Sequence, residues 1–268
     1  MHDSLIHPWE YAVAPFPLCD HVYFVGNRWV GSYLLDSGEG LILIDCGMPQ
    51  TLYLLLDSIR ALGFDPHGIR LLLISHAHFD HAGAAEALRH YTGAKLYLAK
   101  EDVPFIGHPE LLLAEPCCCP DFQVDACYDE AQPIRLGRFT IQTLLTPGHT
   151  PGATSFFFDD TADGRPVRCG MHGGLGFATM KDAFLEKAHL PRSLRRDFLS
   201  GLRRLRQLPV TLAIGSHPAA VHMLERWAQR VPGTNPFVDD TTWRWLMDDR
   251  IRAFEETFGA ETDESSSR

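Results

Sequence analysis

The chain has 268 residues, of which 45% are hydrophobic and 22% are charged, so it is long enough and apolar enough to bury a proper core. This composition excludes disorder over most of the chain. The 24 Lys and Arg residues against 34 Asp and Glu residues give a formal charge of -10, which repels phosphate backbones and anionic lipids and disfavours nucleic acid and membrane surfaces as partners.

The first third of the chain predicts short strands joined by turns, over residues 22–25, 31–35 and 41–44. After Pro49, leucines at helical spacing predict a helix over residues 51–62 that ends at Gly63. An apolar run then predicts a buried strand over residues 69–74, followed by a helix over residues 83–91. Strand and helix therefore alternate in this part of the chain.

The rest of the chain predicts further strands and helices around one long irregular segment. That segment, residues 107–133, carries Pro and Cys with little periodicity, and long irregular loops of this kind are usually functional. The predicted strands cover residues 95–99, 139–145, 153–158, 166–169 and 211–214. The predicted helices cover residues 193–208, 219–230 and 241–258. Because no repeat or flexible linker is present, the sequence predicts a single domain over residues 1–260, followed by a polar tail, residues 261–268, that is expected to be disordered.

A dense group of potential metal ligands follows the buried strand. The motif Ser75-His76-Ala77-His78-Phe79-Asp80-His81 contains three histidines and one aspartate. Neutral imidazoles with a carboxylate suit zinc, and a tight turn can aim neighbouring side chains into two adjoining metal positions. Two more histidines, His149 and His217, stand in turns rich in Gly and Pro just after predicted strands. Either one alone fits an ordinary loop histidine, but beside this motif both are predicted to be ligands.

These motifs make the chain resemble the metallo-β-lactamase superfamily, and within it the third subclass of zinc β-lactamases. The segments that carry the resemblance are Ile44-Asp45-Cys46-Gly47-Met48-Pro49-Gln50, residues 76–83, Gly148-His149-Thr150-Pro151-Gly152, His217-Pro218 and Asn235-Pro236-Phe237-Val238. The resemblance implies an α+β fold, a four-layer αββα sandwich, with two zinc ions. Carried over residue by residue, it implies one zinc ion on His76, His78 and His149. It implies the second zinc ion on Asp80, His81 and His217, with no cysteine ligand.

The resemblance also implies a hydrolytic mechanism. A water molecule that bridges two zinc ions has its pKa lowered to about 7, so hydroxide is available to attack a carbonyl carbon. Asp80 is then the implied catalytic residue, which holds the hydroxide and passes a proton. Asp45 ends the strand over residues 41–44, where its carboxylate can accept an N–H from a ligand imidazole and fix the tautomer. A turn-capping aspartate is the alternative interpretation of Asp45.

The segment Gly170-Met171-His172-Gly173-Gly174 departs from the third subclass, whose members usually have serines around Met171 and Gly173 that help to hold the substrate carboxylate. Glyoxalase-type and lactonase-type members carry a bridging aspartate in this region, whereas this chain has no carboxylate between Val167 and Met180. A substrate carboxylate then needs another partner. Met171, His172 and Gly173 are the candidate positions, through the His172 ring or a main-chain amide. An exposed loop histidine fits His172 equally well, and Cys169 is predicted to be a buried strand residue.

Three functions remain open at this point. The first is a zinc β-lactamase of the third subclass, which the near full-length resemblance favours. The second is a hydrolase of the same fold that acts on another amide, ester or lactone, which the missing serines favour. The third is a non-enzymatic zinc-binding protein, which the complete ligand set disfavours. The expected partner is a small-molecule substrate, and the sequence leaves the oligomeric state open.

The cysteines and the N-terminal region bear on the cellular compartment. The seven cysteines are odd in number and lack Cys-x-x-Cys pairs, which suits a reducing compartment, and the triplet Cys117-Cys118-Cys119 is interpreted as free thiols in a loop. No window has the roughly 18 consecutive apolar residues that a membrane helix needs, and prolines interrupt the first twenty residues, so neither a span nor a signal peptide is expected. Cytoplasm is the default expectation, with the periplasm as the alternative if a leader has been removed.

Overall fold

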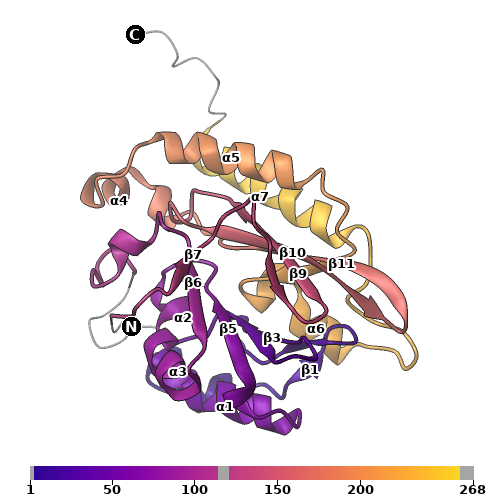
Figure 1. The fold of residues 1–268 in the computed structure, drawn as a ribbon. Helices are drawn as coiled ribbons and strands as arrows, with labels where there is room; N and C mark the ends of the chain where they lie inside the picture. The colour runs from indigo at the N-terminus through magenta and orange to yellow at the C-terminus, as the bar shows by residue number, and fades with distance from the viewer. Residues whose placement is uncertain (1–2, 114–120, 260–268) are drawn as a thin grey trace.

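Two β-sheets lie between outer layers of helices in the computed structural model, which describes residues 3–113 and 121–259 (Figure 1). The first part of the chain builds one sheet and the helices α1 and α3 beside it, and the second part builds the other sheet and the helices α5 and α7. The predicted αββα sandwich is therefore confirmed.

The first sheet follows the order of the chain. Its strands are β1 (Phe16–Pro17), β2 (Val22–Phe24), β3 (Tyr33–Asp36), β4 (Leu41–Ile44), β5 (Ile69–Leu73), β6 (Lys95–Leu98) and β7 (Ala126–Cys127). Neighbouring strands pair antiparallel from β1 to β4 and parallel from β4 to β7. Parallel neighbours need a crossover connection, which α1 (Leu52–Ala61) and α3 (Ala85–Thr92) provide. The parallel strands therefore all end at the same edge of the sheet.

The second sheet has the order β12-β11-β10-β9-β8. Its strands are β8 (Ile134–Leu136), β9 (Phe139–Leu145), β10 (Thr154–Ala162), β11 (Arg165–His172) and β12 (Leu212–Gly215). In this sheet only β11 and β12 pair in parallel.

The other α-helices are α2 (Phe79–Ala82), α4 (Asp182–Lys187), α5 (Ser193–Leu205), α6 (Met223–Ala228) and α7 (Thr242–Phe258). Short 3-10 helices are η1 (Asp3–Leu5), η2 (Pro8–Tyr11), η3 (Pro49–Thr51), η4 (Pro66–Gly68), η5 (Val103–Phe105), η7 (Ala178–Met180) and η8 (Pro218–Val221).

Side chains alternate across each sheet and so build two separate apolar clusters. In β4, Ile42 and Ile44 pack between the two sheets, whereas Leu41 and Leu43 pack on the opposite face with residues of α1 and α3. In β10, Phe158 packs edge-on against Phe139 of the neighbouring strand, and Phe157 meets Trp243 of α7. Continuous apolar runs of this kind are expected for strands that are covered on both faces.

Several expectations about the elements are corrected by the structure. The helix predicted over residues 219–230 is wrong as a single helix, because His222 has φ 51° and separates η8 from α6. A left-handed residue cannot continue a right-handed helix. The strand predicted over residues 166–169 is longer, since β11 pairs through His172 with β10 and β12. Cys169 is buried in that strand, as predicted.

Other expectations fall outside the described residues or concern membranes. The polar tail at residues 261–268 and the triplet Cys117-Cys118-Cys119 both lie outside the described residues. Over residues 3–113 and 121–259, no helix combines the length and apolar character that crossing a bilayer requires.

Candidate metal centre

The six predicted metal-ligating residues gather at one edge of the sandwich, at the ends of strands from both sheets. His76 follows β5, and the short helix α2 after it carries Asp80 and His81. His217 follows β12, and His149 lies in the loop between β9 and β10. Because the two sheets stack with the end of β5, the end of β12 and the β9–β10 loop at this edge, separate segments of the chain converge there.

One group of nitrogens comes from His76, His78 and His149. The Nδ1 atom of His78 lies 3.0 Å from Nε2 of His149. Each of the three residues offers a ring nitrogen that lies within 4.8 Å of the other two. This spacing fits three ligands around one metal ion, because each zinc–nitrogen bond is about 2 Å long.

A second group comes from Asp80, His81 and His217. The Nε2 atoms of His81 and His217 are 3.3 Å apart. The Oδ2 atom of Asp80 lies 3.4 Å from Nε2 of His81 and 3.5 Å from Nε2 of His217. His76 also lies within 4.8 Å of Asp80 and His81, so the two groups adjoin.

Asp45 controls which nitrogen of two histidines carries the proton. Its carboxylate accepts hydrogen bonds from the backbone N–H of Ser75 at 2.7 Å, from the Ser75 hydroxyl at 2.7 Å and from Nδ1 of His81 at 2.8 Å. The Ser75 hydroxyl has one hydrogen, which it gives to Asp45, so its 3.0 Å contact with Nδ1 of His76 requires that His76 donates. The Nε2 atoms of His76 and His81 are therefore left as bare lone pairs.

Backbone carbonyl groups impose the same tautomer on two more histidines. Nδ1 of His149 lies 3.0 Å from the carbonyl oxygen of Gly176, and Nδ1 of His217 lies 2.7 Å from that of Trp29. A carbonyl oxygen can only accept, so both Nδ1 atoms donate and both Nε2 atoms carry lone pairs. Such partners on the far nitrogen are the usual way in which proteins orient metal-binding imidazoles.

The imidazole lone pairs of this cluster form a site that suits a cation. In the neutral rings, the Nε2 atoms of His81 and His217 both carry lone pairs and face one another at 3.3 Å, so no hydrogen bond joins them. The Nε2 atom of His76 is buried and has no hydrogen-bond partner among the described residues, and His78 faces the Nε2 lone pair of His149 through its Nδ1 atom at 3.0 Å. Buried polar atoms are normally paired, and a divalent metal ion satisfies lone pairs that converge in this way.

Burial keeps several of these imidazoles neutral. It lowers the pKa of His76 and His78 well below the ordinary value and that of His149 to about 4. It also lowers the pKa of His217, where the neighbouring His81 adds to the effect. A neutral imidazole is the form that coordinates metal, so these residues are prepared for binding without having to release a proton.

Asp80 supplies the negative charge of the second group. Burial acts to raise the pKa of Asp80, but His81 and His217 lower it more, so this pKa lies below the ordinary value. Burial acts to lower the pKa of His81, whereas Asp80 and Asp45 raise it above the ordinary value. Asp80 is therefore ionised at neutral pH and adds a negative charge where a metal cation fits.

Asp102 joins the two loops that carry the first group. Its buried carboxylate accepts hydrogen bonds from the backbone N–H of Ala77 at 2.9 Å, from the hydroxyl of Thr150 at 2.8 Å and from the backbone N–H of Gly152 at 2.6 Å. Burial raises the pKa of Asp102 to about 6. No sequence motif had singled out this residue. Its position just after β6, the parallel neighbour of β5, is the signal that could have found it.

The glycine-rich stretch after β11 makes room for the ring of His149. A Cβ atom on Gly174 would lie 2.3 Å from Cδ2 of His149, and one on Gly176 would lie 3.0 Å from its Cε1. Contacts this short would force the ring or the backbone to shift. These glycines therefore allow the backbone to pack directly against a predicted ligand.

We expect the variant Gly174→Ala to weaken zinc binding by about 10- to 100-fold, because the added methyl group must push His149 aside. Zinc affinity measured by competition with a chromophoric chelator tests this. Gly201→Ala is the matched control and should keep full affinity, since Gly201 lies in α5 and a Cβ atom added there would meet no atom within 4 Å. Wild-type affinity in Gly174→Ala would contradict the assigned position of His149.

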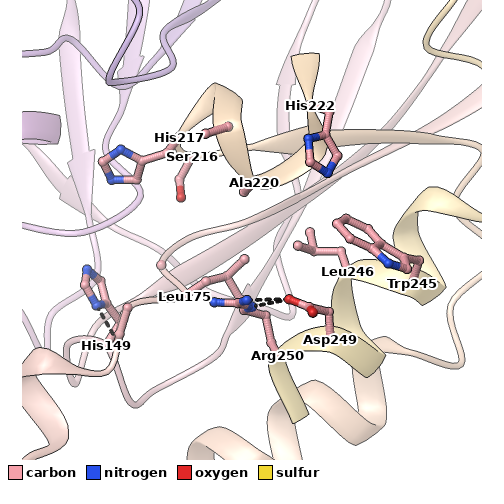
Figure 2. A pocket seen from close by; sticks show the side chains of 13 residues that line it. His149, Leu175, Ser216, His217, Ala220, His222, Trp245, Leu246, Asp249 and Arg250 are labelled. Carbon is pink, nitrogen blue, oxygen red and sulfur yellow. Dashed lines mark hydrogen bonds and ion pairs between the residues drawn. The ribbon is translucent and has the colours of Figure 1, made fainter. Parts of the chain in front are cut away.

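A cavity of about 490 Å³ opens beside the six predicted ligands (Figure 2). These ligands, called the metal-ligating cluster below, are His76, His78, Asp80, His81, His149 and His217. His149 and His217 line one end, and Trp245 and Arg250 of α7 line another part. Figure 2 shows Leu175 between these two regions. The cavity thus gives a small molecule access to the predicted ligands, and sequence patterns gave no sign that α7 contributes to it.

The three candidate substrate-contacting positions lie elsewhere. Met171 and His172 are buried, with 0% and 1% of their surface exposed, and neither lines this cavity. Nδ1 of His172 accepts a hydrogen bond from the backbone N–H of Gly174 at 3.1 Å. Gly173 packs against the backbone of Thr154. The reason is that β11 extends to His172, so Met171 and His172 belong to the sheet rather than to a loop.

Comparisons with known proteins agree with this fold and this cluster. Residues 30–161 match the family model of the Metallo-beta-lactamase superfamily. The chain therefore contains a domain of the metallo-β-lactamase superfamily, as its sequence motifs predicted.

The structural neighbours include subclass B3 metallo-β-lactamases. BJP-1 of Bradyrhizobium japonicum superimposes with a TM-score of 0.83 at 25% identity, over 94% of this chain and 96% of that chain. Native FEZ-1 from Legionella gormanii gives a TM-score of 0.83 at 25% identity, over 92% of this chain and 96% of that chain. The likeness thus extends over nearly the whole of each molecule.

Curated relatives match a shorter part of the chain. An N-acyl homoserine lactonase of Bacillus thuringiensis is 26% identical over 161 residues, which is 52% of this chain and 61% of the relative. The match therefore spans about three-fifths of the lactonase's length.

Proposed function

We propose that this protein is a hydrolase that uses two zinc ions to open the β-lactam ring of small-molecule substrates. The observation that carries the proposal is the set of imidazole lone pairs that converge in two adjoining groups beside an open cavity. A purely structural metal site is closed by its protein ligands, whereas a catalytic site keeps a position open to solvent. The subclass B3 metallo-β-lactamases among the structural neighbours support the same reaction.

The residues divide between two metal positions. His76, His78 and His149 would hold one zinc ion, and Asp80, His81 and His217 would hold the other. Zinc ions bound there would supply a water molecule whose pKa is lowered to about 7 and would polarise the scissile carbonyl group.

The protein's own residues orient the reactants and move the proton. His149 and His217 line the cavity, so the substrate carbonyl carbon approaches between their rings. Asp80 is buried between the two groups, and its carboxylate accepts the proton that the attacking water gives up and passes it to the departing nitrogen. The hydrogen bonds from His81 to Asp45 and from His217 to the carbonyl oxygen of Trp29 keep both rings in place during turnover.

Lactone hydrolysis is the second candidate. The N-acyl homoserine lactonases among the curated relatives favour it, as does the lack of serines at Met171 and Gly173. The chain has no carboxylate between Val167 and Met180, where lactonase-type members carry a bridging aspartate, and this argues for the β-lactamase function. A position in the cytoplasm or the periplasm is compatible with either activity.

We expect the zinc-loaded protein to hydrolyse a chromogenic cephalosporin and to lose this activity when a chelator removes the metal, because every proposed step depends on the metal-ligating cluster. Absorbance at the wavelength of the opened ring measures the rate, and added zinc should restore it. An N-acyl homoserine lactone, assayed in parallel, serves as the competing substrate. Hydrolysis of the lactone alone would favour the second candidate, and cephalosporin turnover that resists the chelator would overturn the metal-dependent mechanism.

A further inference from the structure

The cavity beside the metal-ligating cluster contains a cation from α7. Arg250 lines the cavity, and its side chain is 33% exposed. Its Nε atom donates to Oδ2 of Asp249 at 3.0 Å, and Nη2 contacts the same oxygen. Within residues 3–113 and 121–259, no partner is found for Nη1 of Arg250. One edge of the guanidinium group therefore remains free to bind a ligand.

Two arginines share the carboxylate of Asp249. Nη2 of Arg252 donates to Oδ1 of Asp249 at 2.7 Å, on the other side of the carboxylate from Arg250. Two positive charges against one negative charge leave this corner with an excess of one positive charge. An anionic ligand is attracted to it, whereas a neutral ligand gains little.

The wall next to Arg250 is apolar. Leu175, Leu246 and Trp245 line the same cavity, and Trp245 is 44% exposed although it is a large aromatic side chain. Figure 2 shows Trp245 and Leu246 on the side of the cavity away from His149 and His217. Exposed aromatic surface inside a cavity is typical of a site that takes the apolar part of a ligand.

We propose that Arg250 is the specificity-determining residue that binds the carboxylate of an anionic substrate, whose apolar substituent packs against Trp245 and Leu246. This inference rests on the proposed function, because it assigns the substrate class of the same cavity. The segment at residues 170–174 offers no hydroxyl group to such a carboxylate. A guanidinium group on α7 supplies the missing partner from a different part of the chain.

The test compares benzylpenicillin with its methyl ester, which differ in one negative charge. In Arg250→Met, kcat/KM for benzylpenicillin should fall about 10- to 100-fold, the loss expected for a charge-assisted hydrogen bond, while the methyl ester is unaffected. Arg250→Lys should recover part of the loss, since it keeps the charge without the fork of donors. Arg252→Met is the comparison variant, because Arg252 pairs with the same Asp249 yet is 67% exposed and does not line the cavity. It removes only the screened charge of an exposed side chain, so kcat/KM for benzylpenicillin should fall less than about fivefold.

Equal losses for the acid and the ester in Arg250→Met would overturn the proposal, and so would an unchanged rate for the acid. The ester serves as an internal check on folding, because a misfolded variant loses both activities. If the wild-type protein hydrolyses neither compound, the proposed function fails. Calorimetric titration of the zinc-loaded protein with phenylacetate and phenylacetamide then tests Arg250 separately. Weaker binding of phenylacetate alone in Arg250→Met supports the inference, and equal binding in both proteins overturns it.

Discussion

Replacing Asp80 with asparagine is expected to reduce turnover of a β-lactam by about 10²- to 10⁴-fold while the protein keeps most of its zinc. Asparagine has nearly the same shape and still offers an oxygen atom toward His81 and His217, but it cannot accept a proton as an ionised carboxylate does. Because His81 and His217 hold the pKa of Asp80 low, the wild-type side chain is ionised throughout the neutral range. Zinc content by atomic absorption and steady-state rates measure the two effects separately.

The variant His76→Ala serves as a comparison that separates loss of metal from loss of proton transfer. His76 belongs to both groups of potential ligands, so its loss should remove metal and turnover together. Asp57→Asn is the control for the chemical change itself, because Asp57 lies on the surface with its side chain 71% exposed. If Asp80→Asn hydrolyses every substrate at the wild-type rate, Asp80 has no part in proton transfer. If it loses zinc as His76→Ala does, its role is that of a ligand only.

The clustering of the candidate metal ligands could be predicted largely from sequence because its signal is local. The motif from His76 to His81 follows a strand that is apolar enough to recognise, and α2 after it turns Asp80 and His81 toward the same edge. His149 and His217 could be placed only as turn residues after strands. Their distances of 3.0 Å to His78 and 3.3 Å to His81 depend on how the two sheets stack, which no single segment encodes.

The helices and strands could be predicted where their sequence patterns were long. The predictions failed where an element was short or interrupted. The strand predicted over residues 139–145 matches β9, and the strand over residues 41–44 matches β4. Strands β1 and β7 have two residues each, too few for a periodic pattern, and they exist because neighbouring strands pair with them. The break at His222 depends on a left-handed backbone that histidine rarely adopts, so helical spacing alone predicted one continuous helix.

The residues that line the cavity could not be predicted from the sequence, because their positions also depend on packing between distant segments. The pattern of residues 241–258 predicts a helix but no role for Arg250, because only the packing of α7 on the second sheet brings this residue beside the cavity that His149 and His217 line. Met171 and His172 were predicted to contact the substrate, but they do not line the cavity. Their position matched the family's substrate-contacting segment, but pairing of β11 with β10 and β12 buries them.

Asp45→Asn is expected to reduce zinc affinity about 10- to 100-fold without removing any proposed ligand. The wild-type carboxylate accepts three hydrogen bonds, whereas an amide presents one oxygen and one NH₂ group that can only donate. If the NH₂ group faces His81, the imidazole must accept at Nδ1 and carry its proton on Nε2, where the metal would bind. If it faces the backbone N–H of Ser75 instead, two donors oppose one another in a buried position, which costs about 1–3 kcal/mol of stability.

The two orientations of the amide should therefore change zinc affinity and thermal stability in different ways. The first leaves the melting temperature of the metal-free protein nearly unchanged and weakens zinc binding, because the wrong tautomer of His81 faces His217. The second lowers the melting temperature of the metal-free protein as well. Zinc competition and thermal unfolding of the metal-free protein distinguish the two, with Asp57→Asn as the reference for an exposed aspartate. A variant that equals the wild type in both measurements would show that the tautomer of His81 is set by something other than Asp45.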